Sequence, residues 1–333
     1  MKQNAPLVMF AFNRPEWLRI VLDRLVKAPG VNDRDSFMFI DGPRNDKDKV
    51  SCGQVYEHVL GYASQLPRLK IIRRDVNMGC RKNIIAGITE VVDKYGKVIV
   101  VEDDILVSDT FFAYMDQALE FYNDDKRIWS INAYQNHNMK VPRGYKLDVY
   151  LNAVNNCWGW GTWRDRWDAV DFDMSDWSAL RNDEAMVAKL NAAGKFKIPM
   201  IEDQLAGRIN TWDIQCTYHC VKNGLMSVEP IKRLSKNIGF SSTIESTHCK
   251  SDNPEIVSQK YYNFQPKLVK GLQPDKRIMC QLADIDDPPV TNLIVKKLMR
   301  SKEGRCLLRV MDNFKVRRFN KRIPKSMVPC AVK

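Results

Sequence analysis

The stretch Val98-Ile99-Val100-Val101-Glu102-Asp103-Asp104 is an apolar run that ends in three consecutive carboxylates. Its short apolar part predicts a buried strand. In an open α/β sheet, ligands bind at the carboxyl ends of the strands, so these acids fall where a site is expected. Adjacent carboxylates repel one another, and a divalent cation with oxygen ligands removes that conflict. We therefore expect a metal site here; the alternative is a solvated acidic turn.

Similar short apolar runs on either side of this stretch predict further strands, at residues 7–12, 37–40, 69–72 and 128–131. Amphipathic segments between them predict helices, at residues 16–27, 83–95 and 110–122. Pro15 suits a first helical turn, and Asp109 is a natural N-cap for the third helix. The alternation predicts an α/β fold whose sheet is mainly parallel and covered by helices on both faces.

The regular alternation fades after about residue 145. Residues 158–177 are dense in Trp and Asp, and a helix is expected near residues 183–191. The segment 293–333 carries thirteen Lys or Arg against two acids, and residues 293–325 predict a basic amphipathic helix. That helix either lies on an anionic membrane surface or packs its apolar side on the main domain.

The chain of 333 residues has a formal charge of +12, which favours nucleic acid, an anionic membrane or a phosphate-rich substrate as partner. Its start lacks the apolar segment of a secretory signal, and no run approaches the ~20 apolar residues of a membrane span. The nine cysteines are irregularly spaced, as expected for reduced thiols. We expect a cytoplasmic protein, peripheral on the inner face of the cell membrane if its basic helix binds lipid.

Residues 100–115, Val-Val-Glu-Asp-Asp-Ile-Leu-Val-Ser-Asp-Thr-Phe-Phe-Ala-Tyr-Met, resemble the metal-binding segment of the N-acetylglucosaminyltransferase I family and related GT-A-fold enzymes. The likeness extends over roughly residues 6–135 and includes bacterial family-2-like sugar transferases. It implies a Rossmann-like, mixed and mainly parallel sheet with a C-terminal helical extension. It also implies Mn²⁺ or Mg²⁺ on Asp104, and donor contacts from Glu102 and Asp103.

Three other segments resemble the donor site of the same family. Phe10-Ala11-Phe12-Asn13-Arg14-Pro15 is similar to the first-strand segment that opens the nucleotide site, which implies donor contacts from Phe12, Asn13 and Arg14. Asp41 falls where those enzymes contact uracil. Arg81, in Asn77-Met78-Gly79-Cys80-Arg81, falls where those enzymes contact the diphosphate of the donor. Either arginine could offset charge on a departing diphosphate, because a guanidinium binds two oxygens at once.

A catalytic base is expected in the second half, because an inverting transfer needs a carboxylate to accept the proton of the attacking hydroxyl. Trp212-Asp213 resembles the pair that carries this base in the family, and Glu202 and Asp203 are the alternatives. His248 falls where several GT-A enzymes place a histidine on the metal or diphosphate.

The segment Trp158-Gly159-Trp160-Gly161-Thr162-Trp163 places indoles beside glycines, and sugars pack their apolar faces on such rings. We expect at least one of these rings in the core and at least one in a pocket, with Trp160 contacting the donor. Zinc on Cys216, His219 and Cys220 is disfavoured, since the segment lacks a second paired motif.

Together these features predict an inverting glycosyltransferase. It would move a sugar, most simply from a UDP-sugar, to a glycan or lipid-linked acceptor in bacterial surface polysaccharide synthesis. Residues 1–145 would form the nucleotide-sugar half, 146–270 the acceptor half and 271–333 the basic extension. A sugar-nucleotide nucleotidyltransferase is the first alternative, but the glycine-rich phosphate loop is missing after the first strand. A basic RNA-binding or scaffold protein is the second; the tryptophans lie among aspartates, so no nucleic acid partner is expected.

Overall fold

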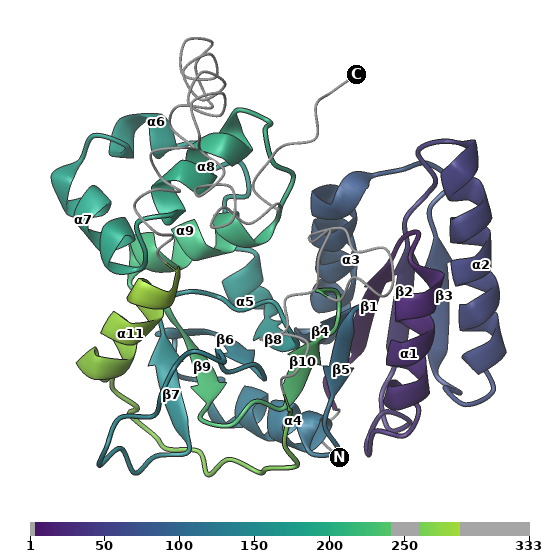
Figure 1. Cartoon of the computed structure of the whole chain (residues 1–333), viewed down its shortest axis with the longest axis horizontal. Coiled ribbons are helices and arrows are strands. Elements are labelled where there is room, and N and C mark those ends of the chain that lie inside the picture. Colours follow the sequence, from purple (N-terminus) through teal and green to yellow (C-terminus); the bar gives the residue numbers. More distant parts are fainter. Residues whose placement is uncertain (1–3, 241–259, 287–333) are drawn as a thin grey trace, which may run out of the picture.

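The computed structural model describes residues 4–240 and 260–286, which build on one central sheet (Figure 1). Its eight strands follow the order β3-β2-β1-β4-β8-β6-β9-β7. They are β1 (Leu7–Ala11), β2 (Ser36–Ile40), β3 (Leu69–Arg73), β4 (Lys97–Glu102), β6 (Ile128–Asn132), β7 (Val149–Asn152), β8 (Trp160–Trp163) and β9 (Met226–Pro230). The strands β3, β2, β1 and β4 run parallel, whereas β8 is antiparallel to both its neighbours. The predicted mixed α/β sheet is confirmed.

Helices cover both faces of this sheet. They are α1 (Pro15–Leu25), α2 (Asp46–Tyr62), α3 (Gly79–Tyr95), α4 (Phe111–Phe121), α5 (Arg164–Trp167), α6 (Trp177–Leu180), α7 (Glu184–Ala192), α8 (Lys197–Leu205), α9 (Asp213–Asn223) and α11 (Lys276–Asp286). Residues alternate between the two faces of β1. Leu7 and Met9 share a core with α1, α2 and α4, and Val8 and Phe10 share another with α3.

The predicted strands and helices of the first half form close to their expected bounds, with three differences. The short strand β5 (Ile105–Val107) was not anticipated. Helix α2 was not anticipated, since its buried side chains are few: Asp48, Cys52, Val55 and Val59. The predicted N-cap Asp109 is wrong. Thr110 holds that position without a side-chain cap, and Asp109 instead pairs with Arg24 (Nη2–Oδ1 2.5 Å).

The second half places a group of helices, α6 to α9, on one side of the sheet (Figure 1). The helix predicted near residues 183–191 is α7, and Asp183 caps it by accepting a hydrogen bond from Met186 N (2.7 Å). Helix α11 packs against β7 through Ile278 and Leu282, which lie in one core with Tyr150. It belongs to the same packed body, although it lies beyond residue 271.

The basic helix predicted at residues 293–325 lies outside the described residues. Within the described ranges, no helix is long and apolar enough to cross a membrane.

Candidate functional site

The three carboxylates of the sequence motif lie at the carboxyl end of β4, next to the end of β1. Asp103 and Asp104 are buried, and Arg14, directly before α1, is paired with both. The distance between Arg14 Nη1 and Asp104 Oδ2 is 3.0 Å. Burial alone would lower the pKa of Arg14, but Asp103 and Asp104 raise it above its ordinary value. The arginine therefore stays charged and partly neutralises the acids.

One guanidinium does not balance three carboxylates. Burial raises the pKa of Glu102 well above its usual range, and the charges of Asp104 and Asp103 raise it further. Burial also raises the pKa of Asp103, although Arg14 opposes that shift. The end of β4 therefore holds more carboxyl groups than Arg14 can neutralise, and a further cation would stabilise their charged forms.

A glycine leaves space beside the third acid. Strand β10 (Ser235–Asn237) pairs antiparallel with β5 (Ile105–Val107), which follows the acids directly. Just after β10, Ile238 N donates to the carbonyl oxygen of Asp104 (2.8 Å). A Cβ atom on Gly239 would lie 2.5 Å from Asp104 Oδ2. Glycine at this position therefore keeps a side chain away from this carboxylate.

The residues at this point fit a hard divalent cation, since carboxylate oxygens are its preferred ligands and Gly239 leaves room for it. Within residues 4–240 and 260–286, no group of three or more His, Cys, Asp or Glu side chains is arranged to hold a metal. Asp104 would therefore share the ion with ligand phosphates, as is usual for Mg²⁺. The second predicted ligand, His248, lies outside the described residues.

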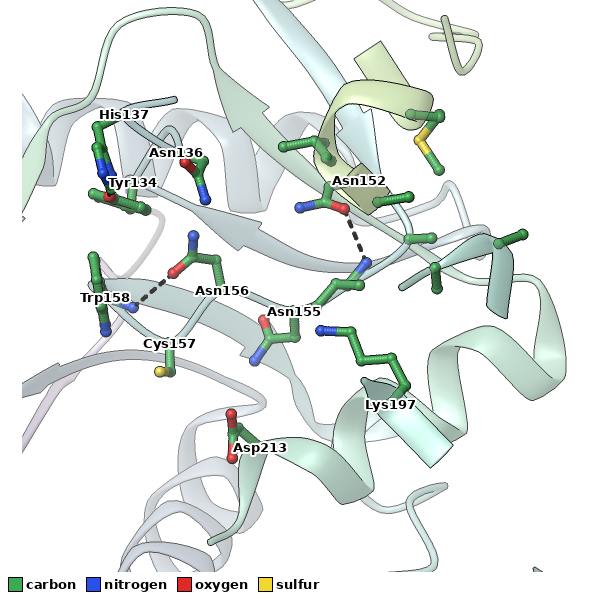
Figure 2. Close-up of a pocket in the computed structure, with 17 residues that line it drawn as sticks. Tyr134, Asn136, His137, Asn152, Asn155, Asn156, Cys157, Trp158, Lys197 and Asp213 are labelled. Atoms are coloured by element: carbon green, nitrogen blue, oxygen red, sulfur yellow. Dashed lines mark hydrogen bonds between the residues drawn. The ribbon is translucent and has the colours of Figure 1, made fainter. Parts of the chain in front are cut away.

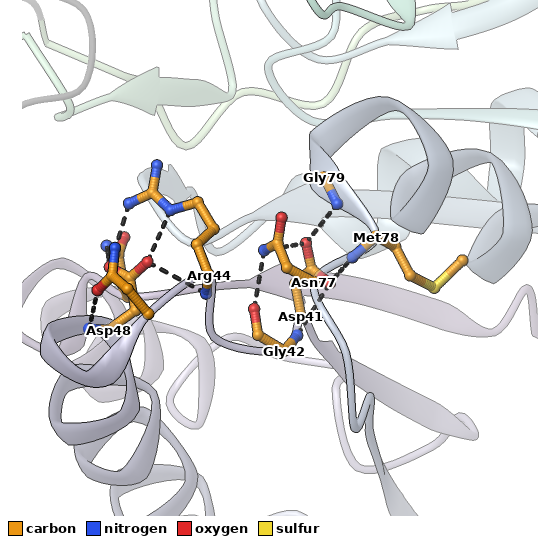
Figure 3. Close-up of polar contacts among 9 residues, drawn as sticks. Asp41, Gly42, Arg44, Asp48, Asn77, Met78 and Gly79 are labelled. Atoms are coloured by element: carbon orange, nitrogen blue, oxygen red, sulfur yellow. Dashed lines mark hydrogen bonds and ion pairs between the residues drawn. The ribbon is translucent and has the colours of Figure 1, made fainter. Parts of the chain in front are cut away.

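The residues after β1 are tied to the start of α2. Asn13 Nδ2 donates to Asp48 Oδ1 (2.8 Å), and Arg44 Nε donates to Asp48 Oδ2 (2.6 Å). The guanidinium of Arg44 lies 4.9 Å from the ring centre of Phe12. Figure 3 shows Arg44 folded back over Asp48. The donor contacts predicted for Phe12 and Asn13 remain predictions.

Asp41, at the end of β2, organises the loop before α3 (Figure 3). Its Oδ1 accepts from Gly42 N (2.9 Å) and Met78 N (2.8 Å), and its Oδ2 accepts from Asn77 Nδ2 (3.1 Å) and Gly79 N (2.9 Å). Both oxygens are engaged by the chain, so a nucleobase would have to share them. The uracil contact remains a prediction.

Arg81, on the first turn of α3, reaches the segment between α5 and α6. Its Nη2 donates to Phe172 O (2.5 Å) and to Asp173 Oδ1 (2.9 Å). Its neighbour Cys80 is exposed at the surface, yet desolvation and the charges of Glu102, Asp213 and Asp103 raise the pKa of its thiol, which places it beside the site. The start of α3 therefore borders the acids, and the diphosphate contact of Arg81 remains a prediction.

A pocket of about 260 Å³ is lined in part by Cys157, a residue on which the charges of Glu102 and Asp104 act. Asp213, at the first position of α9, lines it opposite the segment that joins β7 to β8 (Figure 2). The charge of Asp213 acts on Glu102, and both raise the pKa of Cys157, another lining residue, beyond the effect of burial. The hydroxyl of Thr211 donates to the Asp213 carboxylate. The structure therefore places this candidate base beside the acidic triplet.

The other two candidate bases lie on α8 and do not line this pocket. Asp203 is buried and pairs with Arg208 (Oδ1–Nε 2.7 Å). Glu202 faces Arg181 (Oε1–Nη2 3.6 Å). Their contacts are those of a helix that supports α9, so Asp213 is the better candidate.

The contact between Trp160 and the donor remains a prediction, and this ring is fully buried in the described structure. It stacks between Trp129 (centroids 5.6 Å apart) and Trp212 (5.1 Å). Trp163 is also in the core, whereas Trp158 lines the pocket. The expectation that the three indoles divide between core and pocket holds, with a different member in the pocket.

Cys216 and Cys220 are buried on α9 and share a core with Trp212. Burial raises the pKa of both thiols, so they stay protonated and pack as small apolar side chains.

Several pocket residues were missed from the sequence: Asn136, Asn152, Asn155, Asn156 and Lys197. The run Asn152-Ala153-Val154-Asn155-Asn156 was visible as a local concentration of amides. No pattern marked Lys197, since it gains its place in the pocket from distant segments.

No family model and no curated protein matches this sequence. Solved structures match remotely. The mannosyltransferase PcManGT from Pyrobaculum calidifontis, in complex with GDP-Man and Mn²⁺, is 10% identical over 50% of this chain and 46% of that chain, with a TM-score of 0.37. S. aureus TarS 1–349 is 12% identical over 71% and 60%, with a TM-score of 0.40. The galactosyltransferase LgtC, with donor and acceptor sugar analogs, is 11% identical over 67% and 72%, with a TM-score of 0.36.

This chain spans less than two thirds of the first two of these structures. Two of the three are named as glycosyltransferases, the class of enzyme that the sequence resembles.

Proposed function

We propose that this protein is a GT-A-type glycosyltransferase that moves a sugar from a nucleotide diphosphate donor to an acceptor hydroxyl. One observation carries the proposal: three carboxylates crowd the carboxyl end of β4, and a fourth, Asp213, faces them from an adjoining pocket. Several ionised carboxylates buried together are unfavourable unless a cation neutralises part of their charge. A diphosphate with its bound cation would lie at the end of β4, and the acceptor would lie in the pocket lined by Asp213.

The donor would lie over the end of β4, between the residues that follow β1 and the start of α3. Arg14 and Glu102 border this place, and the loop held by Asp41 closes it. When bound to Asp104, Mn²⁺ or Mg²⁺ would supply stabilisation of the negative charge on the departing diphosphate. A uridine diphosphate sugar is the first donor to test, because Asp41 falls at the uracil position of the resembling family.

Asp213 would act as the base in a single displacement. It lies at the first position of α9, where a helix favours negative charge. Asp213 would accept the proton of the acceptor hydroxyl as its oxygen attacks the anomeric carbon. The bond from that carbon to the diphosphate breaks, and the anomeric configuration inverts. The acceptor would be a glycan or a lipid-linked sugar.

A thermal-shift screen tests the donor part of this proposal. Nucleotide sugars are added with and without Mn²⁺, and a ligand that binds only the native state raises the melting temperature. We expect a metal-dependent rise for one nucleotide diphosphate sugar. Asp104→Asn should abolish that rise without lowering the melting temperature of the free protein, because it removes a charge from a repelling group.

The matched control is Asp109→Asn, which changes an exposed acid five positions away along the chain. It should keep the metal-dependent rise. An unchanged response of Asp104→Asn, or no response of the unaltered protein to any nucleotide sugar, would contradict the proposal.

A further inference from the structure

The pocket beside Asp213 is polar but nearly neutral. Its lining includes four asparagines, one carboxylate (Asp213) and one ammonium group (Lys197), together with small and apolar side chains. With one charged group of each sign, the lining favours neither an anionic nor a cationic ligand. Amide groups together with apolar surface suit a ligand that carries hydroxyl groups and C–H faces.

The asparagines of the segment that joins β7 to β8 use their oxygens within the chain. Asn152 Oδ1 accepts from Val154 N (3.1 Å), and Asn156 Oδ1 accepts from Trp158 N (3.4 Å), as Figure 2 shows. Asn136 Oδ1 likewise accepts from Asn138 N (3.0 Å). Because backbone N–H groups orient these amides, the nitrogens of Asn136 and Asn156 are left as donors. The pocket therefore offers donors to the oxygens of a ligand.

Asn155 is the clearest of these donors. The side chain is 5% exposed, and its Oδ1 accepts from Ser130 Oγ (3.0 Å). Its Nδ2 is buried and has no hydrogen-bond partner among the described residues. A buried donor without a partner is unfavourable, and a ligand oxygen would satisfy it. Figure 2 shows this amide among the lining residues, on the side that Asp213 faces.

A rigid polar network supports the donor. Glu229 is fully buried on β9; it accepts from Asn152 Nδ2 (3.0 Å) and Asn132 Nδ2 (3.3 Å), and from the hydroxyl of Tyr150. Ser130 Oγ lies 2.7 Å from Ser227 Oγ on the neighbouring strand. The amides beneath the pocket are thus held by paired strands, so little entropy would be lost when they bind a ligand.

The size and the aromatic wall point to one ring. Trp158 contacts Tyr134 edge to face, with centroids 4.4 Å apart, and both line the pocket. An indole beside amide donors matches a pyranose, which has an apolar face and polar edges. The volume of about 260 Å³ is below the ~300–1,000 Å³ of pockets for drug-sized ligands. It suits a single sugar unit.

We propose that this pocket is an acceptor subsite for one uncharged sugar ring, with Asn155 Nδ2 and Asn156 Nδ2 donating to its oxygens and Trp158 against its apolar face. The assignment rests on the proposed glycosyltransferase function, in which the hydroxyl nearest Asp213 is the one that reacts. It identifies the part of the acceptor that enters the pocket as an uncharged sugar unit.

Saturation-transfer NMR with the full chain tests the subsite directly, without donor or metal. The probes are the neutral methyl glycosides of glucose, galactose and N-acetylglucosamine, and the anionic methyl glucuronide. The unaltered protein should bind at least one neutral glycoside better than the glucuronide. Asn155→Ala should weaken that binding by about ten-fold or more, the equivalent of one lost hydrogen bond.

Asn223→Ala is the matched control, because Asn223 is exposed at the far end of α9. It should bind as the unaltered protein does. Asn156→Ala, at a half-buried position, gives a second reading if Asn155→Ala fails to fold, and it too should bind more weakly.

Absence of neutral glycoside binding, preference for the glucuronide, or unchanged binding by both pocket variants would overturn the subsite. The nucleotide-sugar screen is independent of this outcome. If a nucleotide sugar raises the melting temperature but no neutral glycoside binds, only the subsite is contradicted. If a glycoside binds but no nucleotide sugar raises the melting temperature, the proposed function is contradicted.

Discussion

Asp213 and Arg14 have opposite electrostatic effects on the acidic triplet. Arg14 pairs with Asp103 and Asp104 and lowers the repulsion within the group, whereas the charge of Asp213 adds to it. A fourth carboxylate nearby raises the cost of keeping these acids charged, so the proposed role of Asp213 as the base calls for a direct test.

Replacing Asp213 by asparagine tests its role as the base. Asp213→Asn should slow sugar transfer by about 10²–10⁴-fold, the usual contribution of general base catalysis, and leave donor binding intact. Transfer is measured as release of the nucleotide diphosphate under saturating acceptor. Glu202→Gln serves as control, since Glu202 faces Arg181 outside the pocket, and it should change the rate only slightly. Equal transfer rates for the two variants would show that Asp213 is not the base.

Asp48 gives a pH-dependent prediction at the same scale. Hydrogen bonds from Arg44 and Asn13 outweigh burial and lower its pKa to about 2. Because the folded pKa lies below the unfolded value of about 3.9, Asp48 stabilises the fold above pH ~4 and loses this effect as the pH falls toward ~2. Solvent screening around the half-exposed Arg44 limits the effect to about 1 kcal/mol.

Asp48→Asn should therefore lower the free energy of unfolding at neutral pH and make little difference near pH 2, measured by urea titration across this range. Asp46→Asn, an exposed acid on the same helical turn, should show no such trend. A constant difference between Asp48→Asn and the unaltered protein at every pH would contradict the assignment.

At the scale of elements, the ends of β2 and β4 and the starts of α1, α2 and α3 form one edge of the sheet. Gly42 follows β2 and lies against the backbone of the next loop, since a Cβ atom there would come within 2.3 Å of the carbonyl carbon of Val76. Asp41 ties the same two segments together by hydrogen bonds. Close backbone approach, rather than a positive φ, requires glycine at this position.

Two glycine substitutions test whether close packing requires the glycine at position 42, because the second glycine, in a helix, has no close neighbour. Gly42→Ala should lower the free energy of unfolding by about 1–3 kcal/mol, because the backbone must move. Gly53→Ala, inside α2 with open space around it, should raise stability by about 0.5–1 kcal/mol. Denaturant unfolding of both variants measures the two signs, and a stable Gly42→Ala protein would show that the loop has room to shift.

At the scale of the whole molecule, a stack of indoles joins the sheet to the helices of the second half. Trp129 and Trp160 come from the sheet and Trp212 directly precedes α9, so the stack places Asp213 relative to β4. Helix α11 closes the other side of the pocket with Met279, Leu282 and Ala283. The site is therefore assembled from segments more than 250 residues apart in the chain.

Ile278 tests whether α11 is part of this body. It is fully buried against β7, and Ile278→Ala should lower the free energy of unfolding by about 2–5 kcal/mol in a single transition. Cys280→Ala, at an exposed position of the same helix, should have almost no effect. Two separate unfolding transitions, or equal stability of the two variants, would show that α11 is not packed on the sheet.

Much of the first half could be predicted from local patterns. Apolar runs such as 98–101 mark buried strands, and an acid placed directly after such a strand lies at the sheet edge whatever else the chain does. Helix α2 escaped prediction because few of its side chains are buried. The asparagines of the pocket were not predicted, because the sequence does not distinguish an amide in a loop from an amide in a binding site.

The sequence by itself determined the α/β class and the acidic edge of β4, because both follow from the order of apolar and charged residues along short segments. Only the tertiary structure distinguished Trp158 from Trp160 and Asp213 from Glu202. Each of those pairs has the same local chemistry, and burial separates its members. Burial depends on packing partners that lie far away in the chain and meet only when the sheet and the helices of the second half come together.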